Sequence, residues 1–385
     1  GPIFDEWPTA SQRFLLGEDW EQVVHQGTLD AISLRRHLRR ILSRAYRRPA
    51  DDEEIDRIVE VIQKRAESGR SPLEAFADGV KTVLCSPNFL YWNEGDADSL
   101  PNWALACRLS AFLWSSVPDD ELSNLAESGR LADEEVLLAQ LDRMLASPKS
   151  AAFVDGFLDS WLTLRELGAT PPDRSEFPDY YQYDLGSAML IETQLFTRHL
   201  LDENLSIANF LAADFTFINK RLAWHYQLEV PAELVTDAGR FVRVQLPDNR
   251  RGGLLGQASV LTVTANGIDT SPVVRGVWLL ENILGTPPNP PPPDVEPLDP
   301  DVRGAKTIRD QLERHRNTPS CYECHRKIDP PGFALENFDP AGRWRERYIA
   351  FKGRKREKGP EIDASFALPD GREFDSLHQF RKLIL

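Results

Sequence analysis

Residues 321–325 are Cys-Tyr-Glu-Cys-His, the segment of this sequence whose residue types and spacing indicate chemistry most directly. Two thiols separated by two residues can form thioether bonds with the two vinyl groups of one porphyrin, and a histidine directly after the second thiol can then ligate the iron. The pattern predicts one covalently bound c-type haem, with Cys321 and Cys324 as attachment residues and His325 as the proximal axial ligand.

Three other interpretations of this motif stay open. A zinc site would combine Cys321, Cys324 and His325 with a fourth ligand such as His315, although adjacent residues reach tetrahedral geometry poorly. A thioredoxin-like redox pair needs a strand before the motif and a helix after it, whereas polar residues precede it and Pro330-Pro331-Gly332 indicates a turn. The third interpretation is a plain disulfide between the two cysteines.

The residues around the motif are typical of a haem environment. A proximal histidine commonly donates its other ring N–H to a backbone carbonyl, and the predicted turn after the motif is placed to offer one. Nearby aromatic side chains would form an apolar wall, and arginines would neutralise the propionates. The candidate pocket and propionate residues are Arg275, Pro330, Phe333, Arg343, Trp344 and Arg345.

The sixth iron ligand has several candidates. Small cytochromes c take a methionine downstream of the motif, but the two methionines here, Met144 and Met189, both lie upstream. The candidate distal ligands are Met189, His199, His225, His315 and His378. An iron without a protein ligand at this position would be open to peroxide or oxygen.

The predicted helix over 183–202 carries a carboxylate, Glu192, on its apolar stripe. A carboxylate on a buried face needs a partner. Glu192 either pairs with an arginine or faces a cofactor or substrate. Beside an open iron, it is the candidate distal acid–base group.

Composition limits the classes of function. The 45 basic and 60 acidic residues give a net charge of −15, which disfavours nucleic acid as a partner. No apolar run approaches the roughly 18 residues of a membrane-spanning helix, so no transmembrane segment is expected. Four cysteines in 385 residues exclude a disulfide scaffold. Cys85 and Cys107 lie in helical contexts and are expected to be small buried thiols, with a disulfide between them as the alternative.

The elements that must position these residues are mostly helical. Apolar spacing and cap-like pairs predict helices from Leu34, after Asp51 and after Ser71, and a capped helix after Ser271. Val242 and Val244 have strand character, and so do residues 261–264, although 254–263 could instead continue a helix. The expected fold class is mainly α, with multi-helical domains, a C-terminal c-type cytochrome-like haem module and little β. The predicted divisions are a linker over 1–25, a helical domain over 26–95, a helical bundle over 100–235, a haem module with a proline-rich strap over 245–350, and an extension over 351–385.

Several motifs together resemble a known family. They are Arg-Ala-Tyr-Arg-Arg-Pro at 44–49, Ser-Pro-Asn-Phe-Leu-Tyr at 86–91, the segments 108–115 and 222–226, and then Arg-Gly-Gly-Leu-Leu at 251–255, Thr-Ser-Pro-Val-Val-Arg-Gly at 270–276, the haem motif with Ile-Asp-Pro at 328–330, and Gly-Arg-Trp-Arg at 342–345. The chain resembles planctomycete-type multidomain cytochrome c proteins, in which helical domains of unknown function precede a Cys-x-x-Cys-His haem module.

The resemblance implies that this chain is part of a larger secreted protein, with a missing upstream domain before residues 1–25 and a missing downstream domain after 351–385. It also implies carbohydrate as a partner of the missing domains. Covalent haem attachment predicts a periplasmic or secreted location, with the signal peptide not in this chain.

Three functions are compatible with these observations. The first is a c-type cytochrome module that carries one haem c and exchanges electrons with a redox partner protein or a small-molecule oxidant. The second is a haem peroxidase or oxidase with an open distal site, acting on carbohydrate-derived substrates. The third is a structural or binding protein without haem.

Overall fold

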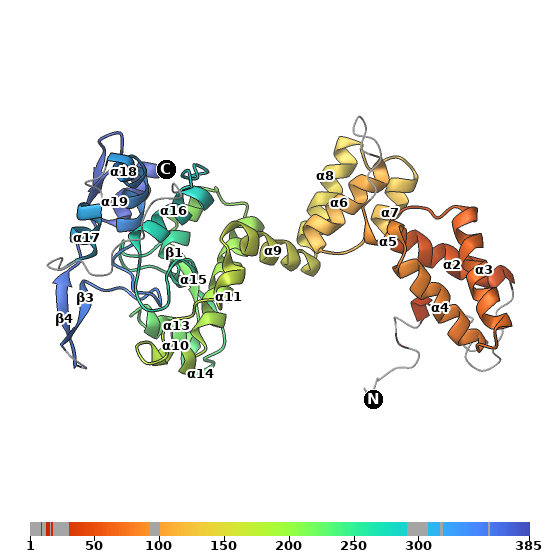
Figure 1. Cartoon of the computed structure of the whole chain (residues 1–385), viewed down its shortest axis with the longest axis horizontal. Coiled ribbons are helices and arrows are strands. Elements are labelled where there is room, and N and C mark those ends of the chain that lie inside the picture. Colours follow the sequence, from red (N-terminus) through yellow and green to blue (C-terminus); the bar gives the residue numbers. More distant parts are fainter. Residues whose placement is uncertain are drawn as a thin grey trace. The chain divides into compact units, whose positions relative to one another are not determined.

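The computed structural model of the chain describes residues 9, 13–15, 17, 31–92, 101–290, 307–315, 319–352 and 355–385. The chain divides into two compact units, Gly1–Phe153 and Val154–Leu385. Their boundary falls inside the segment 100–235 that the sequence groups as one helical bundle. The structure is mainly helical, which confirms the prediction of a mainly α fold with little β, and its strands form small antiparallel pairs (Figure 1). Within the described ranges, no helix is long and apolar enough to cross a membrane.

The first unit begins with three helices that pack on one another. They are α2 (Ala31–Tyr46), α3 (Asp52–Glu67) and α4 (Pro72–Leu84). Asp51 and Ser71 each accept a hydrogen bond from the third backbone N–H of the following helix, and a glutamate at that position completes a capping box. Leu38, Leu42 and Ile55 are fully buried in the core between these helices. The three helices lie where the sequence predicts them.

The rest of the first unit is also helical. Its elements are α5 (Pro87–Leu90), α6 (Asn102–Trp114), α7 (Asp120–Glu127), α8 (Glu134–Ala146) and the 3₁₀ turn η2 (Pro148–Ser150). Trp114 donates its indole N–H to the carbonyl of Met144 at 3.0 Å, and both side chains lie in the core. Cys107 is buried as predicted, but Cys85 is exposed, because it caps the end of α4. No disulfide joins the four cysteines, all of which the structure describes.

The second unit starts with helices around a short hairpin. After α9 (Ala151–Trp161), which includes the boundary, come η3 (Leu164–Glu166), α10 (Pro178–Gln182), α11 (Leu185–Asp202), α12 (Asn209–Ala212), β1 (Phe215–Ile218), α13 (Lys220–His225), α14 (Glu233–Thr236) and β2 (Val242–Gln245). Strands β1 and β2 pair antiparallel, with Phe215 opposite Gln245 and Ile218 opposite Val242. The strand character of Val242 and Val244 is therefore confirmed.

The C-terminal half of the second unit contains the motif. Its elements are η4 (Leu254–Gly256), α15 (Ala258–Val263), α16 (Pro272–Asn282), α17 (Ile308–His315), α18 (Pro319–Phe333), β3 (Arg347–Lys352), β4 (Lys355–Glu361), β5 (Phe366–Ala367), β6 (Glu373–Phe374) and α19 (Leu377–Ile384). The strand predicted over 261–264 is wrong, and the helical alternative is correct. Because Val260, Leu261 and Thr262 follow one another and are all buried, this short helix resembles a buried strand in sequence.

Helices α16 and α18 approach each other closely because glycines lie at their contact. A Cβ atom on Gly276 of α16 would overlap the carbonyl oxygen of Ile328. A Cβ atom on Gly332 of α18 would overlap the carbonyl oxygen of Pro272. These two backbone contacts fix α18 against α16, so that the helix carrying Cys321–His325 has one position on the core.

The turn predicted at Pro330-Pro331-Gly332 is wrong, because these residues belong to α18. Both prolines lie inside the helix, where each lacks the N–H that would bond to the preceding turn. The helix continues past them, and the N–H of Ala334 donates to the carbonyl of Pro330 at 3.2 Å. Tertiary packing on α16 stabilises a helix that local proline chemistry disfavours.

Candidate functional site

Helix α18 carries the three residues of the motif on neighbouring positions of its surface. Cys321 and Cys324 are three residues apart, which places their side chains on one face of the helix. His325 follows Cys321 by four residues and joins the same region. Both thiols and the imidazole are half-buried, and neither cysteine forms a disulfide. The helix therefore presents two accessible thiols and one imidazole together.

The imidazole of His325 is held by a carboxylate. Its Nδ1 atom lies 2.9 Å from Oδ1 of Asp329, one helical turn further along α18. The sequence predicts a backbone carbonyl from 330–332 in this role, and that expectation is wrong. The carbonyl of Pro330 already accepts the N–H of Ala334, and the carbonyl of Gly332 accepts that of Leu335. The spacing of four residues between a histidine and an aspartate was the signal in the sequence that could have identified the partner.

A pocket of 520 Å³ lies beside Cys324. Its lining consists of Leu280, Leu284, Thr286, Pro287, Pro288, Asn289, Glu323, Cys324, Lys327, Pro331, Leu368, Pro369 and Phe380. The volume is within the range of about 300–1,000 Å³ that ligand pockets occupy. Pro287 and Pro288 begin the predicted proline strap over 287–293, of which residues 291–293 lie outside the described ranges. Cys321 and His325 do not belong to this lining, so the pocket borders the motif on the Cys324 side.

The predicted aromatic wall lies in the core rather than along this pocket. Phe333 is fully buried and stacks on Phe366 with ring centroids 5.4 Å apart. Trp344 packs edge-on against Phe338 at 5.2 Å. Pro330 is buried within α18. These residues support the helix that carries the motif.

The predicted propionate arginines already have partners. Arg275 is fully buried and donates to the carbonyls of Leu335 and Phe338 at 2.8 Å each, and burial lowers its pKa to about 10. Arg345 pairs with the buried Glu336 at 2.9 Å. Arg343 pairs with Asp179 at 3.3 Å. Among the residues that line the pocket, the basic side chain is that of Lys327.

The candidate distal ligands are spread over the second unit. Met189 is fully buried and accepts a hydrogen bond from Thr262 at 3.9 Å. His199 lies edge-on to the rings of Phe215 and Phe217.

The remaining candidates are three histidines. Nε2 of His225 lies 2.7 Å from the carbonyl of Ala341, and burial lowers the pKa of this histidine to about 3. His378 lies on α19, two residues before the pocket residue Phe380. The side chain of His315 lies outside the described residues. Of the distal candidates whose side chains the structure describes, none lines the pocket beside Cys324.

Glu192 has two hydroxyl partners instead of an arginine. Thr216 donates to its Oε1 at 2.6 Å, and the phenol of Tyr226 donates to Oε2. Burial raises the pKa of Glu192 to about 7, against the lowering effects of these hydrogen bonds and of the charge of Arg251. Arg251 itself donates to the carbonyls of Gly256 and Gly342 and lies over the ring of Tyr226. The group is a buried polar cluster in which the carboxyl is easily protonated.

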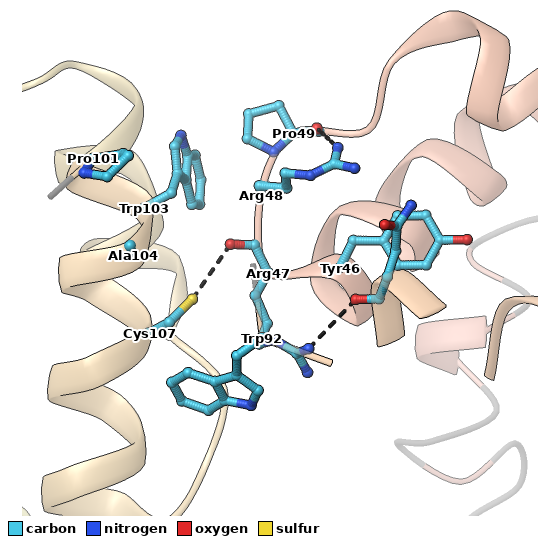
Figure 2. Close-up of a pocket in the computed structure, with 10 residues that line it drawn as sticks. Tyr46, Arg47, Arg48, Pro49, Trp92, Pro101, Trp103, Ala104 and Cys107 are labelled. Atoms are coloured by element: carbon cyan, nitrogen blue, oxygen red, sulfur yellow. Dashed lines mark hydrogen bonds between the residues drawn. The ribbon is translucent and has the colours of Figure 1, made fainter. Parts of the chain in front are cut away.

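A second pocket, in the first unit, was not anticipated from the sequence. It has a volume of 390 Å³, and Figure 2 shows Trp92 and Trp103 among the residues that line it. In the same view, Sγ of Cys107 donates to the carbonyl of Arg47 at 3.4 Å. Arg47 has a positive φ of 60° and donates to the carbonyl of Phe89, so it joins the ends of α2 and α5. The wall residues come from three helices and the segments between them, which explains why no local motif indicated the pocket.

Within the described ranges, no group of three or more His, Cys, Asp and Glu side chains is arranged to hold a metal ion. The zinc interpretation of the motif therefore has no complete ligand set among those residues. A thioether-bound haem has a different requirement, since the porphyrin brings four of the iron ligands and the protein adds the axial ones. Two accessible thiols and an anchored imidazole fit that requirement.

Three family models match consecutive segments of the chain. Residues 33–94 match PSD5, a protein of unknown function (DUF1595), and residues 100–228 match PSD4, a protein of unknown function (DUF1592). Residues 251–348 match PSCyt3, a protein of unknown function (DUF1588). The three models are domains of planctomycete-type multidomain cytochrome c proteins, and the name of the third indicates a cytochrome-like module. The comparisons with curated proteins and with solved structures gave no match.

Proposed function

We propose that residues 251–348 are a c-type cytochrome module that binds one haem covalently and transfers electrons. The observation that carries the proposal is the surface of α18, where the half-buried thiols of Cys321 and Cys324 lie one turn apart and His325 follows. The similarity of this segment to PSCyt3 supports the same conclusion.

The residues of the module have separate roles in this proposal. Cys321 and Cys324 attach the porphyrin, and His325 supplies the proximal nitrogen. The pocket beside Cys324 shields one edge of the group from water, and Lys327 in its lining supplies a positive charge for a propionate. A bound haem supplies a one-electron couple, so a redox partner protein or a small-molecule oxidant completes the function. Haem attachment of this kind places the protein in the periplasm or outside the cell.

The test is expression of the chain together with a cytochrome c maturation system. Wild-type protein is expected to give a c-type pyridine haemochrome spectrum with one haem per chain, and its Soret band is expected to survive acid–acetone extraction. Replacing Cys321 and Cys324 by alanine should abolish the covalent band. The matched control is Cys85→Ala, which removes an exposed thiol elsewhere on the chain. Wild-type protein that contains zinc or a disulfide and no covalent haem would refute the proposal.

A haem peroxidase or oxidase is the second candidate. It is favoured by the position of the described distal candidates, which have partners in the core or lie outside the lining of the pocket. This function predicts a high-spin resting ferric spectrum and turnover of peroxide, with carbohydrate-derived compounds as the first substrates to assay. A low-spin, six-coordinate spectrum would instead support electron transfer alone.

A further inference from the structure

Asp329 occupies an unusual position for a carboxylate on this helix. Its side chain is fully buried, whereas the side chain of His325 is 12% exposed. The two residues are four apart on α18, a spacing that brings side chains together on one helix face. The contact of 2.9 Å therefore joins a partly buried imidazole to a fully buried carboxylate.

The packing of α18 keeps this carboxylate in the interior. Ile328 and Pro330, its neighbours in sequence, are buried. The carbonyl of Ile328 lies against Gly276, and Gly332 lies against the carbonyl of Pro272, so the helix cannot rotate Asp329 toward water without losing both contacts. In an interior of low dielectric, a hydrogen bond to a charged acceptor is stronger than it would be in water.

The bond has a consequence for the other imidazole nitrogen. A neutral imidazole carries one proton, and an acceptor at Nδ1 places that proton on Nδ1 and the lone pair on Nε2. A carboxylate acceptor makes the ring more electron-rich than a backbone carbonyl would, since charge-assisted hydrogen bonds are roughly twice as strong as neutral ones. Such partners orient a metal-ligating histidine and raise its basicity.

We propose that Asp329 is a positioning residue that fixes His325 as a strongly basic proximal ligand and thereby lowers the reduction potential of the module. The inference rests on the proposed function, because it needs His325 to ligate haem iron. A more basic ligand stabilises the ferric form more than the ferrous form, because the ferric form carries the larger positive charge.

The test compares Asp329→Asn with wild-type holoprotein by spectroelectrochemical titration. Changes to partners of metal-bound histidines typically lower metal affinity or activity by about tenfold or more, and we take the lower end as the scale for the effect on reduction. We expect the equilibrium constant for reduction to rise about tenfold in the variant, which for a one-electron couple is a potential higher by about 59 mV. Asp329→Glu, which keeps the carboxylate, should recover part of the shift.

The matched control is Glu346→Gln. Glu346 is an exposed residue of the same module and does not line the pocket, so this change removes a negative charge without touching His325 or the proposed haem site. Its potential should move much less than that of Asp329→Asn. Equal shifts in both variants would mean that the effect is general electrostatics, and would overturn the role of the hydrogen bond.

Two further outcomes separate this inference from the proposed function. Absence of covalent haem in wild-type protein refutes the proposed function, whereas full haem loading with an unchanged potential in Asp329→Asn refutes only the inference. If that variant does not fold, nitrogen-15 NMR of the wild-type apoprotein can show which ring nitrogen of neutral His325 carries the proton. The His325 signals are assigned by their loss in His325→Gln. The proton is expected on Nδ1, and a proton on Nε2 would contradict the proposal.

Discussion

The buried carboxyl of Glu192 makes the stability of the second unit depend on pH in a defined direction. Burial raises its folded-state pKa from 4.5 to about 7. Below pH 4.5 the carboxyl is protonated in both the folded and the unfolded chain, so it has no net effect. Between pH 4.5 and about 7 only the unfolded chain loses the proton, and stability falls as pH rises. A shift of 2.5 pH units, at about 1.4 kcal/mol per unit, makes the total loss about 3 kcal/mol.

Glu192→Gln tests this reasoning, because glutamine resembles the protonated carboxyl in shape and stays neutral. Oε1 of the new amide can still accept the hydroxyl of Thr216 or Tyr226, and either hydroxyl can accept from the amide. The variant should match wild type near pH 4.5 and should be more stable by about 3 kcal/mol at pH 8.

The assay is urea unfolding of both proteins from pH 4.5 to pH 8, with the transition of the second unit followed separately. Glu203→Gln is the control, because Glu203 is an exposed residue that directly follows α11. The control should follow the wild-type pH dependence. Two results would refute a raised pKa of Glu192. One is a Glu192→Gln protein that is less stable than wild type at pH 8. The other is a wild-type free energy of unfolding that does not fall relative to the variant between pH 4.5 and pH 8.

Three other predictions follow from the packing, capping and burial of single residues. Gly332→Ala should lower the free energy of unfolding by about 1–3 kcal/mol in denaturant titration, because its methyl group would overlap Pro272. The control Gly156→Ala, on α9, has open space around the new methyl group and should not lower the free energy of unfolding. Asp51→Ala should destabilise the first unit by about 1 kcal/mol, because α3 loses its N-cap, and an unchanged thermal midpoint would contradict this. His225, whose pKa burial and nearby arginines lower to about 3, should show no titration between pH 5 and 8 by NMR.

Helices with explicit start signals could be predicted from the sequence. Asp51, Ser71 and Ser271 each precede a helix and accept a hydrogen bond from its first turn, as their residue types indicate. These signals are local, because a cap and its amide lie within three residues of each other. The apolar positions that follow them then determine which face is buried.

The strand expected over 261–264 and the turn expected at 330–332 are wrong because distant contacts decide the structure of both segments. In the first segment Leu261, Thr262 and Thr264 are buried, so the burial pattern has no period that separates helix from strand. The second contains two prolines and a glycine, which favour a turn locally. Gly332 is instead needed because the backbone of α16 passes directly against it. A single sequence shows the glycine but not the helix that it contacts.

The motif at 321–325 could be located from its spacing alone, but its surroundings could not. The pocket beside Cys324 combines residues from Leu280 to Phe380, which are 100 positions apart in the sequence. The arginines expected to meet propionates pair with Glu336, with Asp179 and with backbone carbonyls. For Arg275 the reason is burial, because a buried guanidinium needs partners within the fold. The sequence shows that these arginines are charged, but the packing of the fold determines which group each guanidinium contacts.

The two prolines of α18 connect the packing of this helix with its proposed chemistry. Pro330 and Pro331 have no N–H, so the carbonyls of Arg326 and Lys327 cannot receive the usual helical hydrogen bond. The lost bonds lie in the same turn as Asp329, where the helix is stabilised instead by its contact with α16. Because the backbones of α16 and α18 are in direct contact, we expect a displacement of α16 to move Asp329 and His325 as well. Gly276→Ala should therefore alter the reduction potential of the holoprotein as well as its stability, whereas a change in stability alone would show that the hydrogen bond does not depend on this packing.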